Sequence, residues 1–585
     1  MSRPPRPLRT ARPGGTLAPW PRDYLPYEHS DFVALQRRLA QAELGLVSSG
    51  EEGDFAGTLM DLSALVAHVL GVYQNRYARE AFLGTAQSAR SLVWHGRRLG
   101  YEPAPGLAAT GFATLTAHSG LSGLIPAGFV LASSPVGERK AQPYETLEPV
   151  QVDARHNALK LARLEGGSSA LLKGELPLLE PGAYVLLHTE DERVCEVARL
   201  TFVEPVAESG PCVRVGWRVL EHHGPAHTWD AGSLHLRGNM VPLSHGRGVE
   251  QVLGDSDGQQ PFLRFALDTP RVTHLPAPGG AEPVVEISVG GVRWGRVPDF
   301  SRSDADDPHY LVQRDEREVT HVLFGDGRRG AIPPSGQRHI VATYRVGLGR
   351  EGNAEAGHVN RIPRAHPLLA RATNPVPVHG GTEPADVRAV RTQATRRIRT
   401  FDRAVSVRDH ADLALLFPGV ARASARWTQV APGREGVELV VSTLEGELPP
   451  VAALEPLRVF LDARRDTAVT LRLRAPEPLE VEVALRVGLV PGEPEEAVRQ
   501  RLREALHGER EQAPGLFSLR ARELGQPATL GDVHRVLEQV PGIVFTEVVR
   551  LREVGSGTPE MREVLRPASH QWLRLRPEHL SLTLV

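Results

Sequence analysis

Three glycines spaced as G-x-G-x-x-G stand at Gly325, Gly327 and Gly330, directly after the largely apolar run 319–324. In dinucleotide-binding proteins this spacing lets the backbone approach a pyrophosphate, which meets the N-terminus of the next helix. Here the sequence AIPPSG follows, and its two consecutive prolines cannot open a helix in that register. A calcium loop requires several regularly spaced oxygen ligands, whereas Asp326 stands alone. The pattern therefore predicts a hairpin turn in which Gly325, Asp326 and Gly327 accept positive φ at low cost.

Other clusters of polar residues were weighed as metal sites. His222, His223 and His227 lie close together, but no H-E-x-x-H pattern accompanies them, so exposed histidines in a loop are favoured. Asp255 and Asp257 lack the later bidentate glutamate of a calcium-binding loop, which favours a turn. The sequence contains no phosphate-binding P-loop. We therefore expect no catalytic residue, no metal site and no cofactor.

The composition places limits on the class of protein. A chain of 585 residues is too long for one core and predicts about three to five domains. A formal net charge of −2 gives no reason to expect nucleic acid as a partner. Cys195 and Cys212 do not make a disulfide framework, and buried free thiols are favoured. The basic start of the chain has no apolar core, and no run approaches 18 apolar residues, so we expect neither a secretory signal, a spanning helix nor direct membrane insertion.

Residues 1–28 are rich in proline and arginine and are predicted to form a flexible arm, followed by a helical region over 29–104. Thr85 is expected to cap the later helix of this region, and Gly100 to end it in the left-handed conformation. An ordinary helical hairpin and a helix contributed to a bundle between chains both remain open. Both alternatives are explanations of the same apolar seam, whose residues have heptad-like spacing. The seam consists of Leu59, Leu62, Val66, Val69 and Tyr73, and Leu65 and Val72 widen it.

Residues 105–373 change to short strands separated by Gly, Pro, Asp and Ser clusters, and predict a β-rich region of two subdomains. A helical segment follows over 374–432, in which Ser406 and Asp409 form a capping box. The first helix of this segment has an apolar face made of Val387, Val390, Ala394, Ile398 and Phe401. Its basic face could contact a polyanion or an acidic partner, or could simply be solvated, and is made of Arg388, Arg391, Arg396, Arg397 and Arg399.

The last third of the chain alternates strands and helices. Over residues 433–555 the order is β-α-β-β-α with a closing strand, which predicts a ferredoxin-like domain. Residues 556–585 read as a tail whose apolar end, LSLTLV, adds a strand to another element. The predicted fold class is therefore multi-domain α+β, with an N-terminal helical region, a central β-rich region, a helical segment and a C-terminal ferredoxin-like domain.

Several of these segments resemble one protein family. The run FGDGRRGAIPPSGQRHIVATYRVGLGREGNAEAG, residues 324–357, is similar to the most recognisable run of the baseplate J-like proteins of contractile phage tails and tail-like injection systems. The resemblance continues over residues 373–425 with its N-P, G-G, D-R-A-V-S and F-P-G-V elements. The segment DLSALVAHVLGVYQNRYAREAFLGTAQSARSLVWHGRRLGYEPAPGLAA, residues 61–109, is similar to the family's opening helices.

The resemblance implies a structural role rather than an enzymatic one. Proteins of this family are components of baseplate wedges, six of which surround the hub of the tail tube, and they are thought to couple the trigger to sheath contraction. Their partners are other wedge proteins, hub and spike, tube-initiator and sheath proteins, and further copies in a ring. The protein would be made soluble in the bacterial cytoplasm and end in a phage-tail-like particle. A carbohydrate- or receptor-binding β-module and a cell-wall glycan hydrolase are the alternatives.

Overall fold

The computed structural model describes residues 24–25, 27–47, 54–135, 137, 140–208, 210–220, 227–315, 317–431, 433–508, 514–556 and 562–585. The chain divides into two compact units. Unit 1 extends to Pro103 and includes Asp386–Thr395, and unit 2 consists of Ala104–Ala385 and Arg396–Val585. Helices lead in unit 1 and strands dominate unit 2, which confirms a multi-domain chain with an N-terminal helical region and a β-rich bulk. Most of the predicted arm, residues 1–28, lies outside the described residues.

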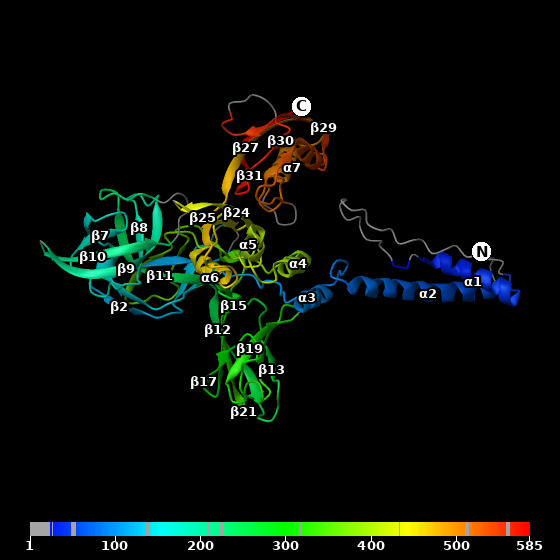
Figure 1. The fold of residues 1–585 in the computed structure, drawn as a ribbon, viewed down its shortest axis with the longest axis horizontal. Helices are drawn as coiled ribbons and strands as arrows, with labels where there is room; N and C mark the ends of the chain where they lie inside the picture. The colour runs from blue at the N-terminus through cyan, green and yellow to red at the C-terminus, as the bar shows by residue number, and fades with distance from the viewer. Residues whose placement is uncertain are drawn as a thin grey trace. The chain divides into compact units, whose positions relative to one another are not determined.

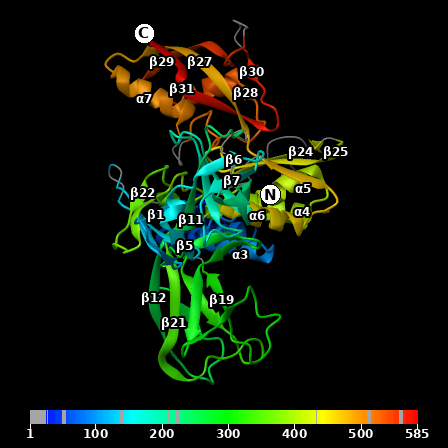
Figure 2. The same cartoon turned by 90° about the vertical axis from the view of Figure 1, so that its left-hand side faces the viewer.

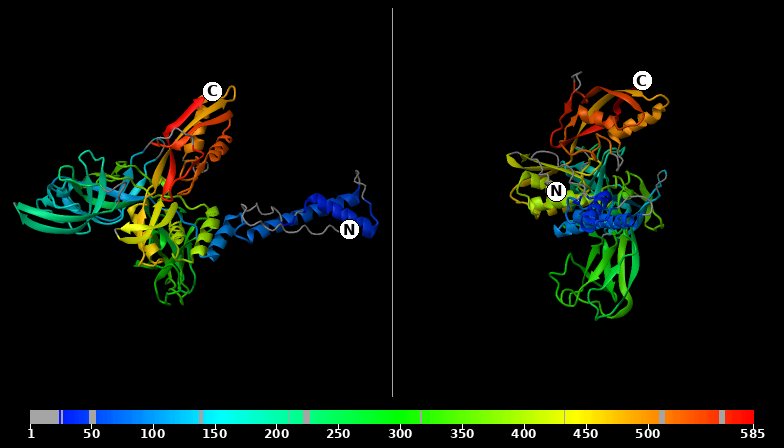
Figure 3. Two further views of the ribbon diagram at one scale, coloured as in Figure 1. Left: turned by 45° about the horizontal axis from the view of Figure 1, so that its top comes forward. Right: turned by 90° about the vertical axis from the view of Figure 1, so that its right-hand side faces the viewer.

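Unit 1 is built around one long helix. Helix α1 (His29–Leu44) lies alongside α2 (Phe55–Glu80) in Figures 1 and 3, and α3 (Ala89–Arg98) follows after a short connection. The carboxylate of Asp54 accepts a hydrogen bond from the backbone N–H of Gly57 at 2.8 Å, which caps the start of α2. Two further helical elements begin in this unit, the 3₁₀ turn η3 (Val387–Ala389) and α4 (Val390–Thr400).

The cap of α3 differs from the predicted one. The hydroxyl of Ser88, not Thr85, accepts the hydrogen bond from the backbone N–H of Ser91 at 3.2 Å. The Thr85 hydroxyl instead donates to the carbonyl oxygen of Arg79 at 2.6 Å, because the chain turns once more before the helix begins. Gly100 has φ of +71°, as predicted for the left-handed residue after the helix.

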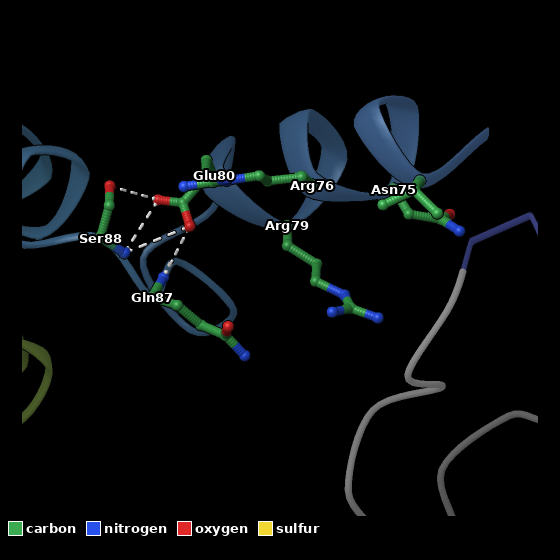
Figure 4. Close-up of a pocket in the computed structure, with 7 residues that line it drawn as sticks. Asn75, Arg76, Arg79, Glu80, Gln87 and Ser88 are labelled. Atoms are coloured by element: carbon green, nitrogen blue, oxygen red, sulfur yellow. Dashed lines mark hydrogen bonds between the residues drawn. The ribbon is translucent and has the colours of Figure 1, made fainter. Parts of the chain in front are cut away.

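A carboxylate joins α2 to α3 (Figure 4). Glu80, the last residue of α2, accepts hydrogen bonds from the backbone N–H of Gln87 at 2.9 Å and from the Ser88 hydroxyl at 2.8 Å. Burial raises the pKa of Glu80, but hydrogen bonds from Ser91, Gln87 and Ser88 outweigh that effect and lower the pKa to about 2. The ionised carboxylate therefore holds the first turn of α3 in place.

The largest sheet of unit 2 has eleven strands in the order β22-β3-β4-β11-β8-β9-β10-β7-β6, with β1 pairing both β11 and β23. Its pairings are antiparallel, and alternate side chains enter apolar cores around Leu186, Leu236 and Leu243. A separate pair is formed by β2 (Ser122–Ile125) and β5 (Val150–Asp153), with the short η1 (Ala154–Asn157) after it. The strands of the large sheet are β1 (Thr110–Ala117), β3 (Val130–Ser133), β4 (Pro143–Thr146), β6 (Leu161–Leu164), β7 (Ser169–Lys173), β8 (Tyr184–His188), β9 (Cys195–Glu208), β10 (Gly210–Val219), β11 (His235–His245), β22 (Val359–Arg361) and β23 (Leu369–Thr373).

The part of the chain that follows β11 and precedes β22 forms two four-stranded sheets. They enclose another core, in which the rings of Trp294 and Phe324 meet edge-on with their centroids 5.3 Å apart. One sheet has the order β12-β21-β16-β17 and the other β13-β20-β19-β18. A short pair, β14 (His274–Ala277) with β15 (Gly280–Pro283), and the turn η2 (Arg350–Gly352) lie outside both sheets. The strands are β12 (Arg247–Ser256), β13 (Arg264–Ala266), β16 (Val285–Val289), β17 (Val292–Arg293), β18 (Gly295–Arg296), β19 (His309–Arg314), β20 (Thr320–Phe324) and β21 (Gly336–Val346).

A buried ion pair ties β21 to the eleven-stranded sheet. The Nε of Arg345 lies 2.9 Å from a carboxylate oxygen of Glu145 in β4, and both side chains are no more than 10% exposed. The same guanidinium donates to the hydroxyl of Ser244 at 2.7 Å and to its carbonyl oxygen at 2.9 Å. The backbone N–H of Gly248 donates to Glu145 at 2.5 Å, so both charged groups have further hydrogen-bond partners.

After α4, a small α/β layer forms from α5 (Val407–Ala414), α6 (Val451–Asp462) and a sheet of the order β24-β25-β26. Ser406 and Asp409 form the predicted capping box of α5, with the hydroxyl of Ser406 accepting from the backbone N–H of Asp409 at 3.2 Å. The strands β24 (Arg422–Ala431) and β25 (Arg434–Ser442) are antiparallel, whereas β26 (Thr470–Arg474) returns parallel to β25 after α6.

The ferredoxin-like domain predicted for residues 433–555 is not confirmed, because its strands divide between two sheets. Strands β25 and β26 pair with β24, whereas β27 (Glu477–Leu489) and β29 (Ile543–Glu553) pair with β31 (Gln571–Leu584). The prolines around 476 end β26 before it can pair with β27. The apolar end of the predicted tail instead supplies β31, which runs parallel to β27.

The C-terminal sheet carries helices α7 (Glu495–His507) and α8 (Leu530–Leu537), seen beside it in Figure 2. Buried Val498, Leu502 and Leu537 from these helices pack with Val483 and Leu551 of the sheet. A minor pair, β28 (Ala528–Thr529) with β30 (Val564–Leu565), completes the domain.

Replacing Arg345 with Ala should destabilise unit 2 by about 3–5 kcal/mol, because Glu145 would stay buried without its cation. Replacing both residues with Met should restore most of the loss, since no uncompensated charge remains. Urea denaturation followed by tryptophan fluorescence measures both effects. An equal loss in the single and double variants would contradict this account.

Replacing Glu80 with Gln should loosen α3 and remove a pH dependence. Because the folded pKa of Glu80, about 2, lies below its ordinary value of 4.5, the stabilisation is complete above pH 4.5 and is lost as the pH falls towards 2. Hydrogen exchange of the amides of α3 across this pH range, in the native chain and in the variant, measures the difference. Identical pH profiles in the two proteins would refute the role of the carboxylate.

Candidate assembly interface

The predicted seam of α2 lies in solvent in the described structure. Its five residues, Leu59, Leu62, Val66, Val69 and Tyr73, are between 43% and 60% exposed. The residues of α2 that are buried are mostly small or polar, namely Gly57, Ala64, Gly71 and Asn75. Helix α2 therefore shows the reverse of the usual pattern, in which the large apolar side chains are inside.

The exposed apolar surface is wider than the predicted seam. With Leu59, Val66 and Tyr73 at heptad position a, Leu62 and Val69 fall at d. Phe55 extends the d row by one heptad, and it is 75% exposed. The flanking e and g positions are also apolar and exposed, and are occupied by Leu65, Leu70, Val72 and Tyr77. We call this whole set of ten residues the α2 apolar surface.

The polar contacts of α2 lie away from the a and d rows. The hydroxyl of Ser63 donates to the side chain of Gln36 in α1 at 2.7 Å, and the His29 ring meets the carbonyl oxygen of Asp61 at 3.2 Å. The amide of Asn75 bonds both backbone groups of Leu25, at 2.8 and 3.0 Å. Contacts inside unit 1 thus hold the side of the helix at Asn75 and Asp61 and reach its e row at Ser63, while the a and d rows stay exposed.

Covering the α2 apolar surface would be strongly favourable. Each of its side chains is roughly half exposed or more, so complete burial would contribute about 1 kcal/mol per residue. Ten exposed apolar side chains on one helix are typical of an interaction site.

By length and composition alone, α2 could cross a membrane, so the expectation that the sequence excludes a spanning helix is wrong. The expectation counted uninterrupted apolar runs, whereas α2 is interrupted by neutral residues and carries few charges before Arg76. Its polar side, with Asp61, His68 and Asn75 at seven- and fourteen-residue steps, is typical of a helix packed against other helices and not of one surrounded by lipid.

The glycine-rich run after β20 is a turn but not a β-hairpin. Strand β20 pairs with β13 and β19, whereas β21 pairs with β12 and β16, so the strands on either side of the run belong to different sheets. The prediction of a hairpin was wrong because pairing partners are set by distant strands and not by the turn. The carboxylate of Asp326 accepts from the backbone N–H groups of Arg328 at 2.9 Å and Arg329 at 2.7 Å, which closes the turn locally. These bonds lower the pKa of Asp326.

The three predicted turn residues have different backbone roles. Only Gly327 among them has positive φ, at +77°, and Gly330 adds a second at +81°. A Cβ on Gly325 would overlap the carbonyl oxygen of Gly330, so this position requires glycine for close approach of the backbone. The backbone N–H of Gly330 in turn donates to the carbonyl oxygen of Asp304 at 3.0 Å, so the run packs against its own domain.

Four of the five predicted basic-face arginines have partners inside their own unit. The guanidinium of Arg391 donates to the carbonyl oxygens of Leu83 and Ala86. Asp412 lies 3.7 Å from Arg396 and 2.7 Å from Arg399, while Arg397 lies 3.6 Å from Asp402. Arg388 is exposed. These contacts do not test whether the face binds a partner, which stays a prediction.

The histidine and aspartate clusters serve local structure. His222 and His223 lie outside the described residues, and the ring of His227 packs edge-on against Trp229 at 4.5 Å. The carboxylate of Asp257 accepts from the backbone N–H of Gln259 at 3.1 Å, as expected for a turn. Asp255 instead lies in β12 and accepts from the backbone N–H of Arg338 in β21 at 2.6 Å. Cys195 and Cys212 are half-buried free thiols. Within the described ranges, no group of three His, Cys, Asp or Glu side chains is placed to hold a metal ion.

Comparisons with known proteins agree with the resemblance. Residues 28–98 match the model for the bacteriophage baseplate protein N-terminal domain, which contains α1 to α3. Residues 402–474 match the baseplate J-like central domain, which contains α5, α6 and β24 to β26. Two segments of the chain, one in each unit, are therefore similar to domains of bacteriophage baseplate and baseplate J-like proteins. No curated protein matches it.

Solved structures show only a low likeness. The anti-feeding prophage baseplate is 12% identical, covering 92% of this chain and 90% of that chain with a TM-score of 0.33. A TssK-TssF-TssG baseplate subcomplex of the type VI secretion system is 12% identical, covering 71% and 96% with a TM-score of 0.32. The baseplate complex of the type VI secretion system is 14% identical, covering 73% and 90% with a TM-score of 0.27. Values this low support no detailed superposition.

Two substitutions distinguish the two reasons for glycine in this run. Gly325 is required because another part of the backbone lies close to it, and Gly327 because its φ is positive. Gly325→Ala should destabilise the domain by about 3 kcal/mol, because the new Cβ overlaps the backbone of Gly330. Gly327→Ala should cost about 1 kcal/mol, since φ of +77° is strained for alanine but the nearest atoms belong to the flexible Ile332 side chain. Thermal unfolding shows which of the two variants loses more stability. A larger loss of stability for Gly327→Ala than for Gly325→Ala would contradict this account.

Proposed function

We propose that the chain is a structural wedge component of a contractile injection system, in which copies assemble in a six-fold ring around the tube hub and couple the trigger to sheath contraction. The matches of residues 28–98 and 402–474 to baseplate domain models support a structural rather than a catalytic role. Its partners would be other wedge proteins, hub and spike, tube-initiator and sheath proteins, and further copies of itself. Its final location would be the assembled particle.

The observation that carries the proposal is the α2 apolar surface. A protein that worked alone would cover such a surface with its own residues, whereas the segment at Leu25 contacts the opposite side of α2 and α1 reaches the flank of the surface at Ser63. A helix with exposed a and d rows is the half of a helix–helix interface that a partner chain completes. We therefore favour the interchain bundle over a hairpin that packs only on its own domain.

The width of the surface indicates how many helices would join. A two-stranded coiled coil buries the a and d positions and leaves e and g polar. Here Leu65, Leu70, Val72 and Tyr77 make the e and g positions apolar as well. We infer that α2 packs against at least two partner helices, one on each flank of the seam.

A ring explains why a chain with modest contacts could assemble strongly. When one interface repeats around a closed symmetric ring, each added contact becomes intramolecular, and its effective concentration rises. A triggered device also requires two packings that differ by only a few kcal/mol. Both requirements favour many separate contacts per chain over one large interface.

Replacing Leu62 and Val66 with Asp should abolish incorporation of the chain into particles, because two buried charges would enter the bundle. The matched control is Gln74→Asp, which places the same side chain at an exposed polar position of the same helix. Electron microscopy and quantitative mass spectrometry of purified particles measure incorporation. Both variants should retain the melting temperature of the native chain, since the substituted residues are exposed.

Normal incorporation of the Leu62→Asp/Val66→Asp chain would overturn the bundle. Binding of the native chain to lipid vesicles, lost in the same variant, would instead support the membrane-spanning role that the composition of α2 permits.

A further inference from the structure

The turn between α4 and α5 presents two large apolar side chains to solvent. Phe401 is 81% exposed and Val405 is 85% exposed, the highest values among the exposed large apolar residues of the described chain. Ile398, one helical turn before Phe401, is 43% exposed. We call these three residues, with the intervening backbone, the 398–405 knob.

The sequence pattern of α4 places these residues on an apolar face, only part of which is covered. Val390 and Ala394 are completely buried, as a core-facing stripe predicts. The same stripe continues through Ile398 and Phe401, where it becomes exposed. The chain therefore covers the beginning of this face and leaves its end open.

The backbone of the knob has a left-handed conformation that favours glycine at the position of Phe401. Phe401 and Asp402 have φ of +46° and +59°, in the left-handed region. Glycine adopts this conformation without steric cost and is the usual residue after a helix, whereas a bulky side chain is a genuine outlier there. A phenylalanine at this point is unfavourable for the backbone, so its retention needs an explanation in its side chain.

The knob is anchored by Arg464, which follows the end of α6. The Nε of Arg464 lies 3.1 Å from one carboxylate oxygen of Asp402, and the backbone N–H of Ala404 donates to the carbonyl oxygen of Arg464 at 2.8 Å. The guanidinium of Arg464 also stacks over the ring of Phe460 at 3.9 Å. A side chain presented from a fixed backbone loses little conformational freedom when it binds. Figure 1 labels α4, α5 and α6 around this turn.

Arginines outnumber acidic residues around the knob, although Arg396, Arg399 and Arg408 pair with Asp412 and Arg397 pairs with Asp402. Residues 396–409 contain five arginines and two aspartates. Asp402 and Asp409 are both engaged inside the chain, by Arg464 and by the capping box of α5. Arg403 is exposed, and Arg408 is 74% exposed. A partner must therefore offer an apolar pocket with negative charge at its rim.

We propose that the 398–405 knob docks into an apolar pocket, rimmed by aspartate or glutamate, on a different protein chain of the assembled particle. The inference rests on the proposed function, since it requires an assembly, but it concerns a surface separate from α2. A protein pocket is favoured over an anionic membrane because only three side chains project, from a rigid turn, whereas membrane binding at an interface needs a broad apolar face.

The test places the photo-crosslinking amino acid p-benzoylphenylalanine at position 401 of the full chain, in cells that form the particle. After irradiation, mass spectrometry of purified particles identifies the residue that is cross-linked. The expected product joins position 401 to another protein, at a site of apolar residues within a few positions of Asp or Glu. A cross-link within the same chain, or no cross-link in assembled particles, would overturn the proposal.

The same cross-linking amino acid at two further positions distinguishes the knob from the α2 apolar surface and from exposed apolar residues in general. The same amino acid at Leu62 reports on the α2 apolar surface, so a cross-link at 62 without one at 401 would sink this inference and leave the proposed function standing. Loss of both would sink the two together. Val292, the first residue of β17 and 62% exposed, is the matched control and should give no cross-link to another chain.

Phe401→Gly separates docking from folding. Because glycine suits the left-handed backbone, the variant should melt at the same or a higher temperature than the native chain, while its share in purified particles should fall at least tenfold. A lower melting temperature with unchanged incorporation would show that Phe401 serves the fold alone. Arg403→Glu should weaken incorporation most at low salt, as expected for charges at a rim.

A vesicle assay excludes the other reading. The native chain should not sediment with vesicles of phosphatidylcholine and phosphatidylglycerol through this surface. Sedimentation that Phe401→Gly abolishes would assign the knob to a lipid surface and overturn the proposal.

Discussion

The molecule depends on an apolar surface that its own chain does not cover. A folding chain gains most of its stability by removing apolar side chains from water, yet α2 buries Gly57, Ala64 and Gly71 and exposes large residues on its other side. The rest of unit 1 serves to position that helix. Gln36 of α1 contacts Ser63 of α2, and Glu80 connects the C-terminal end of α2 to the start of α3. The free energy that unit 1 does not gain by folding remains for association with other chains.

Local patterns in the sequence predicted local structure well. The capping box of Ser406 and Asp409 and the left-handed Gly100 depend on neighbouring residues, and the structure confirms both. Heptad spacing placed the seam on one side of α2, but spacing cannot tell whether a covering element belongs to the same chain. The exposure of Phe401 was missed for the same reason, because a helical stripe predicts a buried face and does not say where the covering layer ends.

Features that depend on distant pairing could not be predicted in this way. The glycines after β20 do form a turn, but the sheets on either side of it are set by β13, β16 and other strands far along the chain. The order of strands and helices over 433–555 fits a ferredoxin-like domain, yet β24 and β31, which lie outside that range, capture its strands. Element order is encoded locally, whereas sheet membership is decided by competition between strands across the chain.

The two exposed surfaces differ in the kind of contact that they can make. The α2 apolar surface is long, and charge plays little part in it, so a bundle formed there would be insensitive to salt and slow to dissociate. The 398–405 knob is small, and several arginines lie near it in the sequence. A contact there would be sensitive to salt, and breaking it would cost less free energy than separating the α2 apolar surface from its partner. A device that must hold together while it changes shape requires one contact of each kind, since its trigger has to break a weak interface without breaking the strong one. If the chain is the wedge component proposed above, the α2 surface is suited to permanent assembly, and the knob to the contact that is released.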